Sequence, residues 1–257
     1  MAVIGAILGD IAGSQFEFDR PLGLDYRKCE LFSDKCKFTD DTVMTLAVKK
    51  AIVEDRGYAD CMHELGRQYI DRGYGRHFQN WLMNDLAPAY NSFGNGSAMR
   101  VSYVGEHFST LTEVLTEARK SAEVSHNHPE GIKGAEVTAA CIWMAKHGMD
   151  KEDIYDYVIS EYPPEQYEFS VDKDLRYLEK YYTWDVTCMT SIPVAVRCFY
   201  ESDSFESFMR NVFRLDCDSD TLGAIGGAIA EEYYHGVGFD PKPVLERYLD
   251  DILYSLL

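Results

Sequence analysis

The chain has 257 residues, of which 46% are hydrophobic, so it is long enough to bury one sizeable core. Its formal charge of -18, from 25 basic and 43 acidic residues, argues against partners recognised through their negative charge, such as nucleic acid or an anionic bilayer. The seven cysteines are odd in number and form no CxxC pair, which is typical of reduced thiols in a cytoplasm. These properties predict a cytoplasmic protein, a monomer by default, whose partner is a small molecule or another protein.

The first predicted element is a tightly packed helix over residues 3 to 18, VIGAILGDIAGSQFEF. Gly5, Gly9 and Gly13 stand four residues apart and share one face, where a close neighbour must offset the helix-weakening effect of glycine. Asp10 and Glu17 stand seven residues apart, which places both carboxylates on one face of such a helix. Buried carboxylates favour a nearby cation, so this helix is a candidate part of a metal site. Because Asp10 interrupts the apolar run and no basic segment precedes it, we expect no membrane span.

The next predicted helix begins at Thr39-Asp40-Asp41-Thr42, a typical N-cap sequence followed by an amphipathic run. Further helices are expected at residues 59–71, 77–86, 111–124, 131–147 and 150–160, and the helical pattern resumes at 190–201, 204–215 and 222–234. Residues 161–187 predict a surface excursion with a short helix near 172–180. Since runs with strand alternation are hard to find, we predict one all-α domain over residues 1–257.

The stretch DCDSDT at residues 216–221 places three aspartates at alternate positions just before a predicted helix. It is not an EF-hand calcium loop, because the required glycine and glutamate are replaced by Thr221 and Gly227. Thr39-Asp40-Asp41 repeats the same chemistry, a hydroxyl beside carboxylates at a helix start. On the residues alone, the two clusters fit either two independent helix caps or one site in which their carboxylates hold two divalent cations. The histidines of SHNHP lack further ligands at zinc-finger spacing, so zinc is not expected.

Six short segments follow one another over nearly the whole chain: GAILGDIAGSQFE (5–17), FTDDT (38–42), RGYG (72–75), GNGSAMRVS (94–102), SHNHPEGIKGAEVTAA (125–140) and DSDT (218–221). Together they resemble the ADP-ribosylglycohydrolase family, which includes the dinitrogenase reductase-activating glycohydrolases. The resemblance implies a compact orthogonal bundle of helices around two Mg²⁺ or Mn²⁺ ions. It also implies hydrolysis of the glycosidic bond between ADP-ribose and a modified group on a protein or small molecule. Nucleic acid would enter only as a modified substrate.

The resemblance also implies roles for individual residues. The implied metal ligands are Thr39, Asp40, Asp41, Asp218, Asp220 and Thr221. The implied catalytic residues are Glu17, as a general base or a mobile gate, and Asp41, while Asp10 would order the site from outside the metal shell. The implied substrate-binding residues are Gly73, Tyr74, Gly75, Asn95, Gly96, Ser97 and His126. Among these, RGYG would hold the diphosphate through backbone N–H groups, and the others would line the ribose and adenine end.

One departure from the family pattern leaves an alternative open. Asp216-Cys217 stand where the family usually has two glycines, which would place a side chain, and an extra outer ligand in Asp216, close to the metals. A catalytically silent ADP-ribose-binding module is therefore the alternative to a hydrolase. We expect an arginine linkage to be cleaved, with serine-linked or nucleobase-linked ADP-ribose as alternatives, because the motifs describe only the ADP-ribose half of a substrate.

Overall fold

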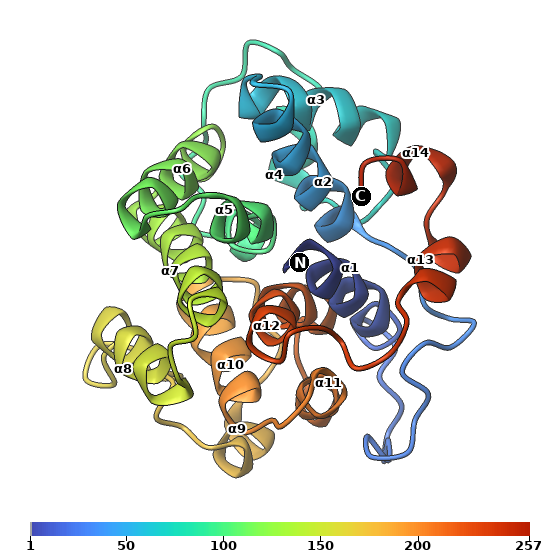
Figure 1. The fold of residues 1–257 in the computed structure, drawn as a ribbon, viewed down its shortest axis with the longest axis vertical. Coiled ribbons are helices and arrows are strands. Elements are labelled where there is room, and N and C mark those ends of the chain that lie inside the picture. Colours follow the sequence, from blue (N-terminus) through green and yellow to red (C-terminus); the bar gives the residue numbers. More distant parts are fainter. Residues whose placement is uncertain (1) are drawn as a thin grey trace.

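The computed structural model describes residues 2–257, which form packed helices (Figure 1). Within this range the only extended pairing is one isolated bridge between Gly94 and Thr187, so the predicted all-α class is confirmed. The helices are α1 (Ala2–Gly13), α2 (Asp40–Val53), α3 (Tyr58–Gln68), α4 (Arg76–Leu82), the 3-10 turn η1 (Asn95–Ser97), α5 (Ser102–His107), α6 (Leu111–Glu123), α7 (Pro129–Lys146), α8 (Lys151–Glu161), α9 (Leu175–Tyr181), α10 (Cys188–Tyr200), α11 (Phe205–Arg214), α12 (Ser219–Tyr233), α13 (Lys242–Tyr248) and α14 (Asp251–Tyr254).

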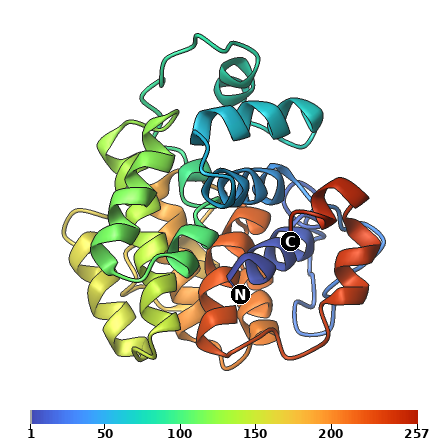
Figure 2. The ribbon, with the colours of Figure 1, turned by 45° about the horizontal axis from the view of Figure 1, so that its top comes forward.

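Helices α1 and α12 form the centre of the molecule. Figures 1 and 2 place them between α5, α6 and α7 on one side and the C-terminal helices α13 and α14 on the other. Every residue of α1 is buried, which agrees with its nearly unbroken apolar sequence. The glycine face predicted for this helix packs directly on the backbone of α12, where a Cβ on Gly9 would overlap the carbonyl oxygen of Gly223. Small residues at this crossing bring the two helices unusually close.

The first helix is shorter than its sequence predicts. It ends at Gly13, so Glu17 follows the helix in a bend, and the prediction that Asp10 and Glu17 share a helical face was wrong. The helix stops because polar side chains beyond its end take over its last carbonyls: Ser14 Oγ donates to Ile11 O at 2.8 Å and Gln15 Nε2 donates to Ala12 O at 3.0 Å. Glu17 is thereby carried on a turn rather than on a rigid helix.

Other predicted helices are present with shifted ends. The helix expected at 77–86 is α4, which ends at Leu82, and the one expected at 172–180 is α9. Helices α5, α13 and α14 had no counterpart among the predictions; they span six, seven and four residues, and so short a segment shows little periodic pattern. Among residues 2–257, no helix combines the length and the apolar character that crossing a bilayer requires.

Candidate active site

The site begins at Asp10, near the end of α1, which ties that helix to the start of α2. Asp10 Oδ1 accepts a hydrogen bond from the Thr39 hydroxyl at 2.7 Å, and Oδ2 accepts from the backbone N–H groups of Thr39 and Thr42 at 3.0 and 3.1 Å. The Thr42 hydroxyl donates to the same carboxylate. Because both oxygens are engaged with the protein, Asp10 positions the N-terminus of α2, where a negative charge is also favoured by the helix dipole.

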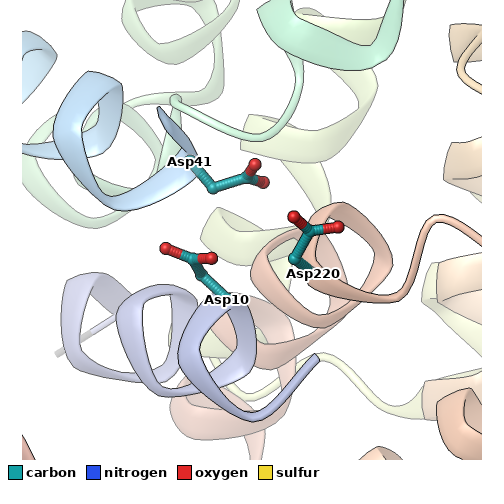
Figure 3. Close-up of side chains that lie close together, drawn as sticks. All are labelled: Asp10, Asp41 and Asp220. Carbon is teal, nitrogen blue, oxygen red and sulfur yellow. The ribbon is translucent and has the colours of Figure 1, made fainter. Parts of the chain in front are cut away.

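Two groups of carboxylates come together around Asp10 and Asp220. The first consists of Asp10, Asp41 and Asp220, which converge from α1, α2 and α12 with ligand oxygens within 4.8 Å of one another (Figure 3). The second consists of Glu17, Asp218 and Asp220, again within 4.8 Å. Asp220 belongs to both groups. The fold therefore brings together the two acidic clusters that lie far apart in the sequence, at the N-termini of α2 and α12.

Asp218 is fixed by a chain of polar contacts. Its Oδ2 accepts a hydrogen bond from Asn95 Nδ2 at 2.7 Å, and the Asn95 backbone N–H donates to Val186 O at 2.8 Å. Asp40 contacts the RGYG segment: its backbone N–H donates to Arg72 O at 2.9 Å, and a Cβ on Gly73 would lie only 2.9 Å from its Oδ1. The RGYG segment thus adjoins Asp40, and the GNGS segment adjoins Asp218.

Burial sets the protonation of these groups. Loss of solvation raises the pKa of Asp10 to about 6 and, despite a hydrogen bond with Asp220, that of Glu17 to about 7. Burial, followed by repulsion from neighbouring carboxylates, also raises the pKa well above the usual range for Asp40, Asp41 and Asp220. So many carboxylates can be ionised together near neutral pH only with added positive charge.

The donor set fits hard divalent cations. Asp41 Oδ1 is buried and has no hydrogen-bond partner within residues 2–257, although a carboxylate oxygen is a strong acceptor. The adjacent Thr221 hydroxyl and the aspartates offer only oxygen ligands, which Mg²⁺ and Mn²⁺ prefer. A buried carboxylate oxygen without a hydrogen-bond partner, surrounded by other carboxylates, fits the role of a cation ligand.

In EDTA, which removes bound cations, we expect the free energy of unfolding of the protein to fall as the pH rises from about 4 to about 7. In the unfolded chain these carboxyls release their protons near pH 4, whereas in the folded chain their raised pKa values retain the protons up to about pH 6 to 7. The folded state therefore binds more protons over this pH range, and its free energy of unfolding falls as the pH rises. For Asp10 alone the shift corresponds to about 3 kcal/mol. Thermal melts in EDTA at pH 5 and pH 7 would measure the fall.

The matched melts contain excess Mg²⁺. There a bound cation takes the place of the protons, so the fall in melting temperature between pH 5 and pH 7 should largely disappear. All melts should contain about 0.5 M NaCl, which screens the general repulsion of an acidic surface. A melting temperature in EDTA that rises between pH 5 and pH 7 would contradict the assigned burial of these carboxyls.

A cavity of about 470 Å³ opens beside the carboxylates. Its walls include Glu17, Asp40, Asp41, Gly73, Gly75, Asn95, Gly96, His126, Asp218, Asp220 and Thr221. Gly73 has φ +111°, a backbone conformation that favours glycine and turns the RGYG segment toward the cavity. His126 is buried, and burial together with the nearby Arg100 lowers its pKa well below the usual value, so it stays a neutral hydrogen-bonding group.

Three predicted residues are not among the described residues that line the cavity. Thr39 faces Asp10 and caps α2, accepting a hydrogen bond from Asp41 N at 3.2 Å. Tyr74 is buried against Phe78, with ring centroids 5.6 Å apart. Ser97 donates its hydroxyl hydrogen to Gly131 O at 2.6 Å. Tyr74 and Ser97 therefore lie outside the described lining, whereas the Thr39 hydroxyl touches the carboxylates of Asp10 and Asp41.

Asp216 and Cys217, which replace the usual glycines of the family, are also absent from the described lining of the cavity. Asp216 is exposed, and Cys217 is buried in the core with its thiol donating to Val212 O at 3.6 Å. Neither belongs to the described lining, so the structure does not place the expected extra outer ligand beside the carboxylates.

Several lining residues were not singled out from the sequence. Phe78, Tyr90 and Arg100 are buried or half-buried lining residues, whereas Phe18 and Trp184 are exposed and so mark the mouth of the cavity. Phe18 could have been noticed because it directly follows Glu17. Trp184 falls in the irregular 161–187 region, where no periodic pattern indicates which side chains turn inward.

Comparisons with known proteins agree with this geometry. Residues 1–237 match the family model described as ADP-ribosylglycohydrolase. ADP-ribosylhydrolase ARH3 of Mus musculus is 24% identical over 90% of this chain and 82% of its own length, and the Homo sapiens protein of that name is 24% identical over 93% and 85%. A solved structure titled "ADP-ribosylglycohydrolase-related protein complex" superposes with a TM-score of 0.75 at 21% identity, covering 99% of this chain and 92% of its own, and so shares the fold. With its family model covering most of the sequence and its fold shared, the chain belongs to the ADP-ribosylglycohydrolase family.

Proposed function

We propose that this protein is a hydrolase that releases ADP-ribose from an arginine side chain, using two divalent cations, Mg²⁺ or Mn²⁺. The observation that carries the proposal is the pair of carboxylate groups sharing Asp220 at one end of a cavity whose other walls are rich in glycine. Two adjacent acidic groups are the usual basis of a two-metal hydrolytic site. Glycine-rich walls let backbone N–H groups approach phosphate oxygens closely. Curated relatives named ADP-ribosylhydrolase support the choice of ADP-ribose.

We assign the cations to Asp40, Asp41, Asp218, Asp220 and Thr221, with Thr39 contributing from the start of α2. When bound, the two cations would supply charge stabilisation next to the scissile bond and lower the pKa of a water molecule. The unpartnered Asp41 Oδ1 supports this assignment, because no other described group satisfies it. Asp10 holds α2 in place and leaves Asp41 free to face the ions.

We assign the proton transfer to Glu17. Its carboxylate lies within 4.8 Å of ligand oxygens of Asp218 and Asp220 and lines the cavity, and its place on a turn beyond α1 permits small movements as substrate enters. Gly73 and Gly75 would hold the diphosphate through their N–H groups, and Asn95 and the neutral His126 would contact ribose hydroxyls.

The test is release of free ADP-ribose from an arginine-ADP-ribosylated protein in Mg²⁺, with a parallel sample in EDTA. We expect release in Mg²⁺ and none in EDTA. Release only from serine-linked or nucleobase-linked substrates would correct the linkage and keep the enzyme. ADP-ribose binding without release from any of these substrates would instead establish the silent binding module. The Asp216-Cys217 departure that suggested this module no longer supports it, since both side chains lie outside the described lining of the cavity.

A further inference from the structure

Two exposed aromatic side chains stand at the mouth of the cavity. Phe18 is 75% exposed and Trp184 is 44% exposed, yet both line the cavity. Their ring centroids are 6.2 Å apart and the ring planes are inclined by 47°. We call this pair the aromatic rim. Large apolar side chains left in solvent beside a binding cavity favour a contact with a ligand, because water otherwise surrounds them without compensation.

The aromatic rim lies at the carboxylate end of the cavity. Phe18 directly follows Glu17. The Trp184 segment is held against the binding loop, since Val186 O accepts from Asn95 N at 2.8 Å and Thr187 pairs with Gly94. The same Asn95 donates to Asp218. If ADP-ribose extends from the carboxylates toward Gly73 and Gly75, as proposed above, the group that leaves the ribose lies on the side of the aromatic rim.

The charge around the aromatic rim favours a cation. Each ring is followed by an aspartate, Asp19 after Phe18 and Asp185 after Trp184. Asp185 accepts hydrogen bonds from Thr187 N and the Thr190 hydroxyl, both at 2.7 Å, while Asp19 makes only an exposed ion pair with Lys35 at 3.3 Å. The rim therefore combines two π faces with Asp185, the residue after Trp184, while Lys35 offsets the charge of Asp19.

The two arginines in the described lining lie elsewhere. Arg76 starts α4, just after the RGYG segment. Arg100 is fully buried, with its guanidinium donating to Ser121 O at 2.7 Å near the end of α6.

We propose that the aromatic rim is the subsite for the leaving group and that it selects a guanidinium. This inference rests on the proposed function and deepens it by naming the residues that select the arginine linkage. A guanidinium is planar and weakly hydrated and stacks on aromatic faces, whereas a serine hydroxyl offers no such contact. A flat group between two rings needs about 7 Å, twice a carbon contact distance of about 3.5 Å. The ring centroids are 6.2 Å apart, so the exposed Phe18 side chain must swing slightly outward to admit such a group.

The experiment compares Trp184→Ala and Phe18→Ala with the unmodified protein. The measurements are kcat/KM for an arginine-ADP-ribosylated peptide and for a serine-ADP-ribosylated peptide in Mg²⁺, and the Kd of free ADP-ribose. We expect each variant to lower kcat/KM on the arginine-linked peptide about tenfold through KM, as expected for a lost cation–π contact, and to leave the Kd of ADP-ribose within about twofold. Both residues are exposed, so neither substitution removes core packing.

The matched control is Tyr181→Ala. Tyr181 is 50% exposed, stacks on Tyr177 with ring centroids 4.7 Å apart, and is absent from the described lining of the cavity. Its removal should change none of the three values. Absence of ADP-ribose binding by the unmodified protein would overturn the proposed function itself. Normal ADP-ribose binding with unchanged arginine-linked kinetics in both rim variants, or hydrolysis of the serine-linked peptide alone, would overturn the aromatic rim as a guanidinium subsite.

Discussion

An Asp220→Ala variant is expected to lose about 10³-fold or more of the hydrolytic activity. Asp220 is the residue shared by the two carboxylate groups found within residues 2–257, so its removal takes an oxygen donor from the point where both groups meet. We expect this loss to weaken binding of the proposed cations more than the loss of a donor that belongs to one group alone. The measurement is the rate of ADP-ribose release in saturating Mg²⁺.

The fold of this variant should persist. Burial raises the pKa of Asp220, and repulsion from Asp218, Asp41 and Glu17 raises it further. Replacing this side chain by alanine therefore relieves an unfavourable interaction in the protein without bound cations. We therefore expect the melting temperature in EDTA to stay level or rise, which separates loss of chemistry from unfolding.

The matched control is Asp216→Ala, which removes an exposed aspartate from the same DCDSDT stretch and should leave activity unchanged. Near-full activity of Asp220→Ala in Mg²⁺ would rule out the two-metal assignment.

The candidate ligands could be identified from the sequence because they are concentrated in short segments. Hydroxyls beside carboxylates at two helix starts indicated hard-cation ligands, and the structure brings Asp41 and Asp220 together as that interpretation required. Spacing alone could not show this meeting, since two separate helix caps would have the same local sequence. What joins the clusters is the packing of α1 on α12 and the hydrogen bonds of Asp10 to α2, both contacts between distant segments.

The position of Glu17 shows where local reasoning fails. Periodicity extended the first helix to residue 18, but side-chain hydrogen bonds from Ser14 and Gln15 end it at Gly13. Such competition between side chain and backbone is not visible in an apolar pattern. The aromatic rim was missed for a related reason, because Trp184 is positioned by a bridge between Thr187 and Gly94 rather than by a helix of its own.

A Gly9→Ala variant is expected to lose about 3 kcal/mol or more of the free energy of unfolding, a fall of about 6 °C or more in melting temperature. The added Cβ would overlap the carbonyl oxygen of Gly223, and a backbone carbonyl inside a helix cannot turn away. Better helix propensity of alanine offsets only about 1 kcal/mol of this. Thermal and denaturant unfolding measure the change. Gly75→Ala is the control for stability, because its Cβ would meet nothing within 4 Å.

The same substitution should also weaken cation binding, which links the packing to the site. Gly5, Gly9 and Gly13 face Gly227, Gly223 and Ser219, so the helices run antiparallel and their contact ends beside Asp220. Separating α1 from α12 at Gly9 moves Asp10 on one helix away from Asp220 on the other, although neither side chain is changed. We expect Mg²⁺ to raise the melting temperature of Gly9→Ala less than that of the unmodified chain. An equal rise would mean that the carboxylates are held together without the glycine crossing.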